Sequence, residues 1–222
     1  MPPKLISVHF PKAAGSSLAN VYEAALGAGR LLRDYAHDPV DPCALMYLDP
    51  VRYEQNKPVS LDPYAAVHGH FHISRYDRLA GAVRVTVLRE PVENFISIYY
   101  FWDHLRRQGR TDGHALYQYF CSSQLTLLEL ASIPALRTLM TGKYFFRVDM
   151  GCFDVIGDAS NLDDYWRRVA GLIGVNFAAL PKSNVTPPSD ERQAKSEDPH
   201  TLARLRTLLA DDLCFYERFC SV

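Results

Sequence analysis

A chain of 222 residues with a formal net charge of −1 and 48% hydrophobic residues has enough apolar material for a sizeable buried core. We expect a single domain over residues 1–222, because α/β domains often exceed 200 residues. The balanced charge gives no support for nucleic-acid binding, so an anionic ligand must be bound by a local cluster of positive groups.

The five cysteines are dispersed and none forms a CxxC pair, which argues against a disulfide framework and against a zinc site. The N-terminal sequence does not resemble a signal peptide, and no apolar run is long enough to cross a bilayer. We therefore expect a cytoplasmic protein without stable membrane insertion. The sequence leaves the oligomeric state open.

Strand and helix patterns alternate along the chain. We expect strands, in chain order, at residues 5–10, 64–68, 82–88, 143–148 and 153–156. We expect helices at residues 18–26, 91–105, 114–140 with an interruption at Pro134, 162–173 and 202–216. Residues 30–63 read as mostly loop with short helical pieces, and residues 181–199 are polar and proline-rich. This alternation predicts an α/β fold with a mainly parallel central sheet flanked by helices.

The loop after the first strand has the residues of an anion site, namely Lys12, Ala13, Ala14, Gly15, Ser16 and Ser17. Backbone N–H groups in such a loop, together with the dipole of the following helix, bind phosphate or sulfate. Lys12 supplies a positive charge for a developing anion. Because the lysine precedes the glycine, the loop is not a Walker A motif, which disfavours a plain P-loop kinase. A serine-capped helix is the alternative explanation.

A second anion site is indicated by Arg89, at the end of the best strand pattern, and Ser97, eight residues later. With a helix that begins at Pro91, Ser97 lies roughly 9 Å along its axis. The guanidinium and the hydroxyl can therefore bind one terminal phosphate. An arginine in a surface ion pair is the alternative.

Three histidines, His68, His70 and His72, alternate directly after a predicted strand. Histidine titrates near neutral pH and suits general-base catalysis, although a lone histidine is more often a structural polar residue. Alternating strand residues share one face, so a metal site is a further alternative. No convincing carboxylate or cysteine partner lies nearby in the sequence, and we predict no metal.

Together, the two anion segments resemble the sulfotransferases that use 3′-phosphoadenosine 5′-phosphosulfate (PAPS), particularly the carbohydrate branch with the heparan sulfate and uronyl 2-O-sulfotransferases. The resemblance implies a P-loop-NTPase-like sulfotransferase fold, with residues 12–17 at the 5′-phosphosulfate and with Arg89 and Ser97 at the 3′-phosphate. His68-Gly69-His70 matches the His-Gly-His of that branch, which implies His68 as the general base, assisted by His70. Weaker matches lie at residues 155–157, 183–186 and 212–216.

We therefore predict a PAPS-dependent O-sulfotransferase that needs no metal and releases 3′-phosphoadenosine 5′-phosphate (PAP). Its expected acceptor is a hydroxyl of a carbohydrate or glycolipid. A nucleotide-dependent small-molecule kinase and a non-catalytic nucleotide-binding module are the alternatives. Arg106, Arg107 and Arg110 fit either an acidic sugar or a solvated basic helix end.

Overall fold

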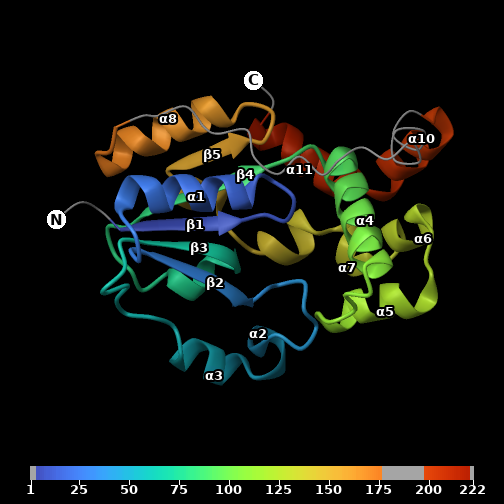
Figure 1. Ribbon diagram of the computed structural model, residues 1–222, viewed down its shortest axis with the longest axis horizontal. Helices are drawn as coiled ribbons and strands as arrows, with labels where there is room; N and C mark the ends of the chain where they lie inside the picture. The colour runs from blue at the N-terminus through green and yellow to red at the C-terminus, as the bar shows by residue number, and fades with distance from the viewer. Residues whose placement is uncertain (1–3, 177–197, 221–222) are drawn as a thin grey trace.

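The computed structural model describes residues 4–176 and 198–220, and its centre is a five-stranded sheet. The strands are β1 (Leu5–His9), β2 (Leu31–His37), β3 (Ala66–Phe71), β4 (Val83–Leu88) and β5 (Val155–Asp158). They are ordered β2-β3-β1-β4-β5, and every pair is parallel. Helices flank the sheet (Figure 1). The predicted α/β fold class, a mainly parallel central sheet flanked by helices, is confirmed by this all-parallel sheet.

The α-helices lie between and after the strands: α1 (Gly15–Leu26), α2 (Leu45–Leu48), α3 (Pro50–Gln55), α4 (Pro91–Arg107), α5 (Ala115–Ser123), α6 (Leu127–Ala131), α7 (Pro134–Arg137), α8 (Leu162–Ile173), α10 (Pro199–Leu208) and α11 (Ala210–Cys220). Three short turns complete them: η1 (Ile73–Tyr76), the π-helical η2 (Met140–Tyr144) and η3 (Met150–Cys152). Among the helices in the described part of the chain, none combines the length and the apolarity that a bilayer span needs.

Local sequence explains where the long helices begin. In α4, Pro91 occupies the first turn and the Glu90 side chain accepts a hydrogen bond from the Glu93 N–H. In α8, the Asn161 side chain accepts from the Asp164 N–H. Both predicted helices are therefore confirmed.

Two predictions were wrong. Residues 31–37 form the edge strand β2 rather than loop, and no strand forms at residues 143–148. The apolar residues there belong to the end of η2 and the turn after it, where Tyr144 and Phe145 are buried. Short apolar runs do not distinguish a buried strand from a buried helical turn, so only packing decided between them. Residues 177–197, which include most of the proline-rich segment and residues 183–186, lie outside the described residues.

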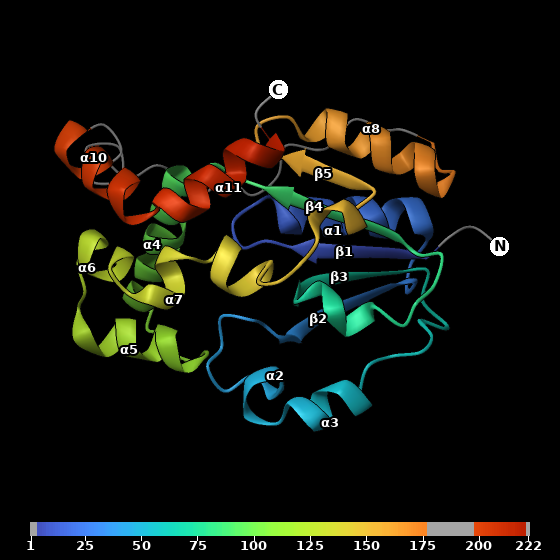
Figure 2. The ribbon, with the colours of Figure 1, turned by 180° about the vertical axis from the view of Figure 1, so that it is seen from behind.

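The sheet places the carboxyl ends of its strands on one side of the molecule. In Figures 1 and 2 the arrowheads point toward the half of the molecule built from α4 to α7 and α11, while α1 and α8 lie along one face of the sheet. Ligands of open α/β sheets bind at this edge. The loop after β1, the end of β3 and Arg89 after β4 all belong to it.

Gly69 allows β2 to approach β3. In the register of the two strands Gly69 pairs with Asp34, and a Cβ at position 69 would lie 1.7 Å from the Asp34 carbonyl oxygen. The register then shifts between Asp34 and His37, as at a β-bulge, which bends the end of β2. The glycine of the His-Gly-His segment therefore has a packing role: it lets the backbone of the edge strand come close.

Gly69→Ala should destabilise the protein by at least about 2 kcal/mol, because the new methyl group displaces the backbone of β2. Urea unfolding measures this loss. Gly171→Ala is the matched control, because a Cβ at that position of α8 meets nothing within 4 Å. The control should be neutral or stabilising by up to about 1 kcal/mol. Equal effects of the two substitutions would refute the packing role of Gly69.

Candidate functional site

The loop between β1 and α1 has an unusual backbone. Lys12 and Ala14 have φ angles of 60° and 62°, in the left-handed region. That conformation costs a residue with a side chain about 1–2 kcal/mol. Strained backbone of this kind clusters at ligand sites, where the surrounding structure maintains it.

Side chains from the β4–α4 segment hold this loop in place. Arg89 Nη1 donates to the Lys12 carbonyl at 3.1 Å, and Asn94 Nδ2 donates to the Pro11 carbonyl at 2.7 Å. Arg89 precedes α4 and Asn94 lies within it, so these two hydrogen bonds anchor the loop to the β4–α4 segment through its backbone carbonyl groups. The two predicted anion segments therefore meet in space.

The start of α1 is suited to an anion. Its N-cap residue is Ala14, whose side chain makes no capping hydrogen bond. The predicted alternative, a helix capped by a serine, is therefore not what forms. Ser16 is exposed and Ser17 is buried in the first turn. N–H groups of a first helical turn lack intrahelical partners and favour negative charge.

Lys12 contacts the helix α4, which contains Ser97. The ammonium of Lys12 lies 4.1 Å from the ring centroid of Phe101 in α4. Ser97 precedes Phe101 by four residues, so both lie on the face of α4 that is turned toward the loop. Ser97 is only 4% exposed. Arg89 also has Glu93 as an ionic neighbour, with Nε 3.8 Å from a carboxylate oxygen.

His68 is enclosed in the core with both ring nitrogens bonded. Its Nε2 lies 3.1 Å from the Gly15 carbonyl and its Nδ1 lies 2.9 Å from Ser7 Oγ. Because a carbonyl only accepts, Nε2 holds the proton. Burial lowers the pKa of His68 to about 3, so the ring is neutral at neutral pH. In this arrangement His68 anchors the start of α1 and has no ring nitrogen left for an acceptor hydroxyl.

His70 has a different environment at the end of β3. Its side chain is 21% exposed, and its Nδ1 lies 3.0 Å from Oδ2 of Asp38. Its Nε2 is enclosed and has no hydrogen-bond partner among the described residues. A histidine held at one nitrogen by a carboxylate, with the other nitrogen unbonded, has the arrangement of a general base.

His9, which precedes the loop, lies against the rings of both His68 and His70. Its ring stacks on His68 at 5.0 Å between centroids and lies 4.6 Å from that of His70. Burial, followed by the charges of His70, His68 and Lys12, lowers the pKa of His9 well below its usual value. A Cβ at Gly15 would lie 1.8 Å from the His9 ring, so the glycine leaves room for it. His9 therefore belongs to the site as a neutral packing partner.

The other candidate residues have structural partners. His72 Nε2 lies 3.0 Å from the Phe146 carbonyl and Nδ1 lies 2.8 Å from Ser74 Oγ. Within residues 4–176 and 198–220 no group of three or more metal-binding side chains gathers. Arg106 and Arg107 both pair with the buried carboxylate of Asp103, at 2.5 and 2.6 Å.

Sequence reasoning missed Asp38 and Asn94. Asp38 follows β2, in the stretch that was predicted to be mostly loop, and its partner His70 is 32 residues away. The one available signal was the strand-like run from Leu31 to His37 followed by Asp38-Pro39, which marks a strand end. Asn94 lay in the predicted helix, but nothing in its spacing indicated a bond to Pro11.

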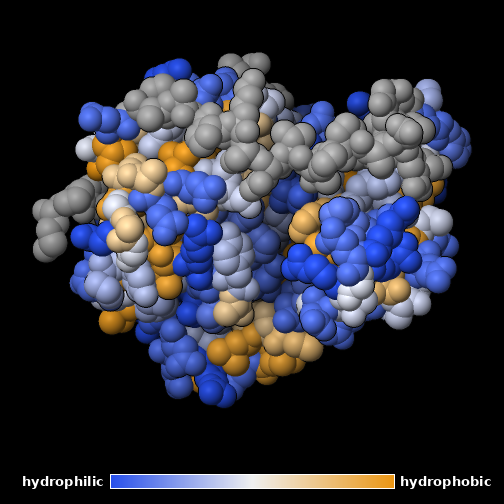
Figure 3. Space-filling view, viewed as in Figure 1, coloured by the Kyte–Doolittle hydropathy of each residue, from blue (hydrophilic) through white to orange (hydrophobic). Residues whose placement is uncertain are grey.

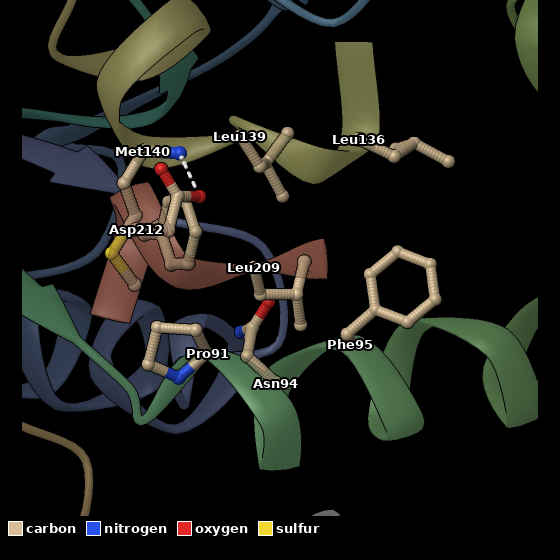
Figure 4. Close-up of a pocket in the computed structure, with 9 residues that line it drawn as sticks. Pro91, Asn94, Phe95, Leu136, Leu139, Met140, Leu209 and Asp212 are labelled. Carbon is tan, nitrogen blue, oxygen red and sulfur yellow. Dashed lines mark hydrogen bonds between the residues drawn. The ribbon is translucent and has the colours of Figure 1, made fainter. Parts of the chain in front are cut away.

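The surface is hollowed and mainly hydrophilic between the part built on the sheet and the part built on α4 to α6 (Figure 3). A separate cavity of about 10 Å³, room for one water molecule, lies behind the loop, where Phe10 and Asn94 contribute to its wall. Beside it, Asp212 accepts hydrogen bonds from the backbone N–H groups of Met140 and Thr141, the first of which is drawn in Figure 4. This cavity is too small for a substrate, and Asp212 is an anchor for η2.

No family model matches the chain, and no curated protein matches it either. Among solved structures, it is similar to a sulfotransferase from Alicyclobacillus acidocaldarius, with 14% identity, a TM-score of 0.45 and coverage of 98% of this chain and 100% of that chain. Mouse sulfotransferase SULT7A1, solved with PAP, gives 9% identity, a TM-score of 0.37 and coverage of 93% of this chain and 64% of that chain. Similarity at this level supports no conclusion about function. The fold class rests on the sheet itself.

The buried neutral state of His68 predicts a loss of stability in acid. The folded pKa of about 3 lies below the unfolded value near 6.5, so the unfolded state binds the extra proton between these values. Stability is therefore fully present above about pH 6.5 and falls as the pH decreases toward 3. In His68→Asn, the loss between about pH 7.5 and about pH 4.5 should shrink by ~2–3 kcal/mol.

Urea titrations at the two pH values measure the difference. His200→Asn, a substitution on the exposed surface of α10, is the control and should leave the difference unchanged. If His68→Asn and the wild type have the same pH dependence, His68 protonates in the folded state over the same pH range as in the unfolded state.

Proposed function

We propose that this protein is a PAPS-dependent O-sulfotransferase. The observation that supports the proposal most strongly is the 3.1 Å hydrogen bond from Arg89 to the Lys12 carbonyl. It joins the two segments that resemble the sites for the 5′-phosphosulfate and for the 3′-phosphate. The histidine cluster adjoins the same loop through His9. One donor with charge at both ends fits such a surface better than two unrelated anions do.

The residues present fit the donor. The backbone from Lys12 to Ser17 would hold the 5′-phosphosulfate, because the Pro11 and Lys12 carbonyls are bonded to Asn94 and Arg89 and the N-cap residue of α1 makes no side-chain hydrogen bond. Arg89 and Ser97 would hold the 3′-phosphate, with the guanidinium supplying paired donors. PAPS supplies the sulfuryl group and leaves as PAP.

We propose His70 as the general base in place of the predicted His68. Nε2 of His70 has no partner among the described residues, whereas both nitrogens of His68 are bonded. During transfer the sulfur–oxygen bond to the donor phosphate breaks and a new one forms to the acceptor oxygen. The hydroxyl proton passes to His70, and Lys12 stabilises the negative charge left on the phosphate oxygen.

A carbohydrate or glycolipid hydroxyl is the proposed acceptor, on the resemblance to the 2-O-sulfotransferase branch. Arg106 and Arg107 are not assigned to an acidic sugar, because Asp103 neutralises part of their charge. Mass spectrometry of glycan and glycolipid pools after incubation with enzyme and PAPS identifies the acceptor by the mass of an added sulfate.

PAP should raise the melting temperature of the protein and ATP–Mg should not. At a PAP concentration about a hundred times Kd the stabilisation is ~2.7 kcal/mol. Selective stabilisation by ATP–Mg would indicate a kinase instead, and no response to either nucleotide would indicate that the nucleotide site is absent.

In Arg89→Ala, the binding free energy of PAP should weaken by roughly 1.5–3 kcal/mol, because a charge-assisted hydrogen bond is lost.

Two comparisons isolate the contact of Arg89. Adenosine 5′-phosphosulfate lacks the 3′-phosphate, so in the same variant its affinity should fall only through the loss of the loop's Arg89 anchor, and by less than that of PAP. Arg204→Ala removes an exposed arginine of α10 and should leave both affinities unchanged. Equal weakening of the two ligands by Arg89→Ala would overturn the assigned contact.

His70→Gln should lower turnover by about 10²–10⁴-fold while PAP still binds, because proton transfer is lost and the donor site is not. His68→Gln should act mainly on stability. Steady-state rates on the identified acceptor, normalised to the PAP-binding fraction, separate these effects. Full activity in His70→Gln together with loss in His68→Gln would return the base to His68.

A further inference from the structure

We propose that Asp38 is a positioning residue that holds His70 in the tautomer needed for proton abstraction; the inference rests on the proposed function of the same site. Asp38 follows the bulged end of β2, and its side chain is 18% exposed. Oδ2 lies 3.0 Å from His70 Nδ1. Oδ1 accepts from the Val40 N–H at 3.0 Å and from the Tyr144 hydroxyl at 2.9 Å.

These bonds determine which nitrogen of His70 holds the proton. Burial acts to raise the pKa of Asp38, but the bonds and charge of His70, with Val40 and Tyr144, outweigh it and lower the pKa below its ordinary value. Asp38 is thus a carboxylate that only accepts, and His70 Nδ1 must be the donor. In the neutral ring Nε2 then has its lone pair, and it is the atom without a partner among the described residues.

Tyr144 keeps the carboxylate in one orientation. It is fully buried, and burial followed by the charge of Asp38 raises its pKa well above the ordinary value, so its hydroxyl stays protonated and donates. It ends η2, whose first two N–H groups are bonded to Asp212 of α11. The orientation of His70 is therefore fixed by β2, β3 and η2 together.

A second His–Asp pair, His37 with Asp34, differs from the His70–Asp38 pair in the other partners of its carboxylate. His37 Nδ1 lies 2.8 Å from Oδ1 of Asp34, but the other oxygen of Asp34 accepts from Arg75 and Tyr76, which makes it a shared structural anchor. Among the described residues, no lysine or arginine is bonded to Asp38, whose partners are Val40, His70 and Tyr144. When His70 takes a proton, the Asp38 charge is available to stabilise the imidazolium.

Asp38→Asn is the test, because it removes the charge and keeps the shape. The oxygen of the amide should replace Oδ1, which accepts from Val40 and Tyr144, so its NH₂ group should face His70 and donate to Nδ1. The ring should then switch from the Nδ1–H to the Nε2–H tautomer. Nitrogen-15 spectra of the histidine side chains in full-length protein distinguish the tautomers without any acceptor, and the His37 ring is the internal reference, which should not change.

The kinetic arm uses the acceptor found by mass spectrometry. Asp38→Asn should lower kcat on the order of 10²–10⁴-fold with little change in the KM for PAPS, because Nε2 then holds a proton and cannot accept one from the acceptor hydroxyl. Tyr144→Phe, which removes one bond and keeps the ring, should give a smaller loss. Binding of PAP should equal that of the wild type in both variants.

The outcomes separate the two proposals. An unchanged His70 tautomer in Asp38→Asn, or an Nε2–H tautomer in the wild type, would overturn the role of Asp38 even where PAP binds. A wild-type protein that fails to bind PAP would overturn the proposed function, whereas the tautomer switch would still establish the link between Asp38 and His70. A switched tautomer with unchanged kcat would show that the pair is only structural.

Discussion

The close contact between the Asp34 carbonyl and Gly69 brings β2 against β3, and the candidate base depends on it. A methyl group at position 69 would lie 1.7 Å from that oxygen, so only glycine permits the register. After this contact the register shifts, and the chain leaves the sheet at Asp38, within hydrogen-bond distance of His70. A constraint on backbone packing thus places a carboxylate beside an imidazole, and the proposed general-base chemistry depends on the approach of these two strands.

The loop proposed to bind the donor also depends on contacts with its backbone. Arg89 and Asn94 bind the carbonyls of the loop, which holds Lys12 and Ala14 in a conformation that neither residue adopts readily. The elements β4 and α4 are well packed in the core, so they can maintain this strained conformation. His68 adds a tie from β3 to the first residue of α1. The loop is therefore shaped by its surroundings before any anion binds.

The two histidines of the His-Gly-His segment differ in environment, although residues two apart on a strand face the same side of the sheet. His68 points into the core, where Ser7 and a backbone carbonyl use both nitrogens. His70, two residues later, shares that side of the sheet but lies near the strand end, where its side chain is partly exposed and Asp38 lies 3.0 Å from its Nδ1. Position along the strand, rather than residue type, separates an anchor from a candidate base.

The sequence by itself determined the α/β class and the helices at Pro91 and after Asn161, and it predicted the two anion segments, because strand runs, caps and loop composition are local signals. Only the tertiary structure decided that β2 is a strand, that residues 143–148 are not, and that Asp38 rather than a nearer residue faces His70. Those outcomes depend on contacts between segments tens of residues apart, and short apolar runs or single carboxylates have no local pattern that specifies their partner.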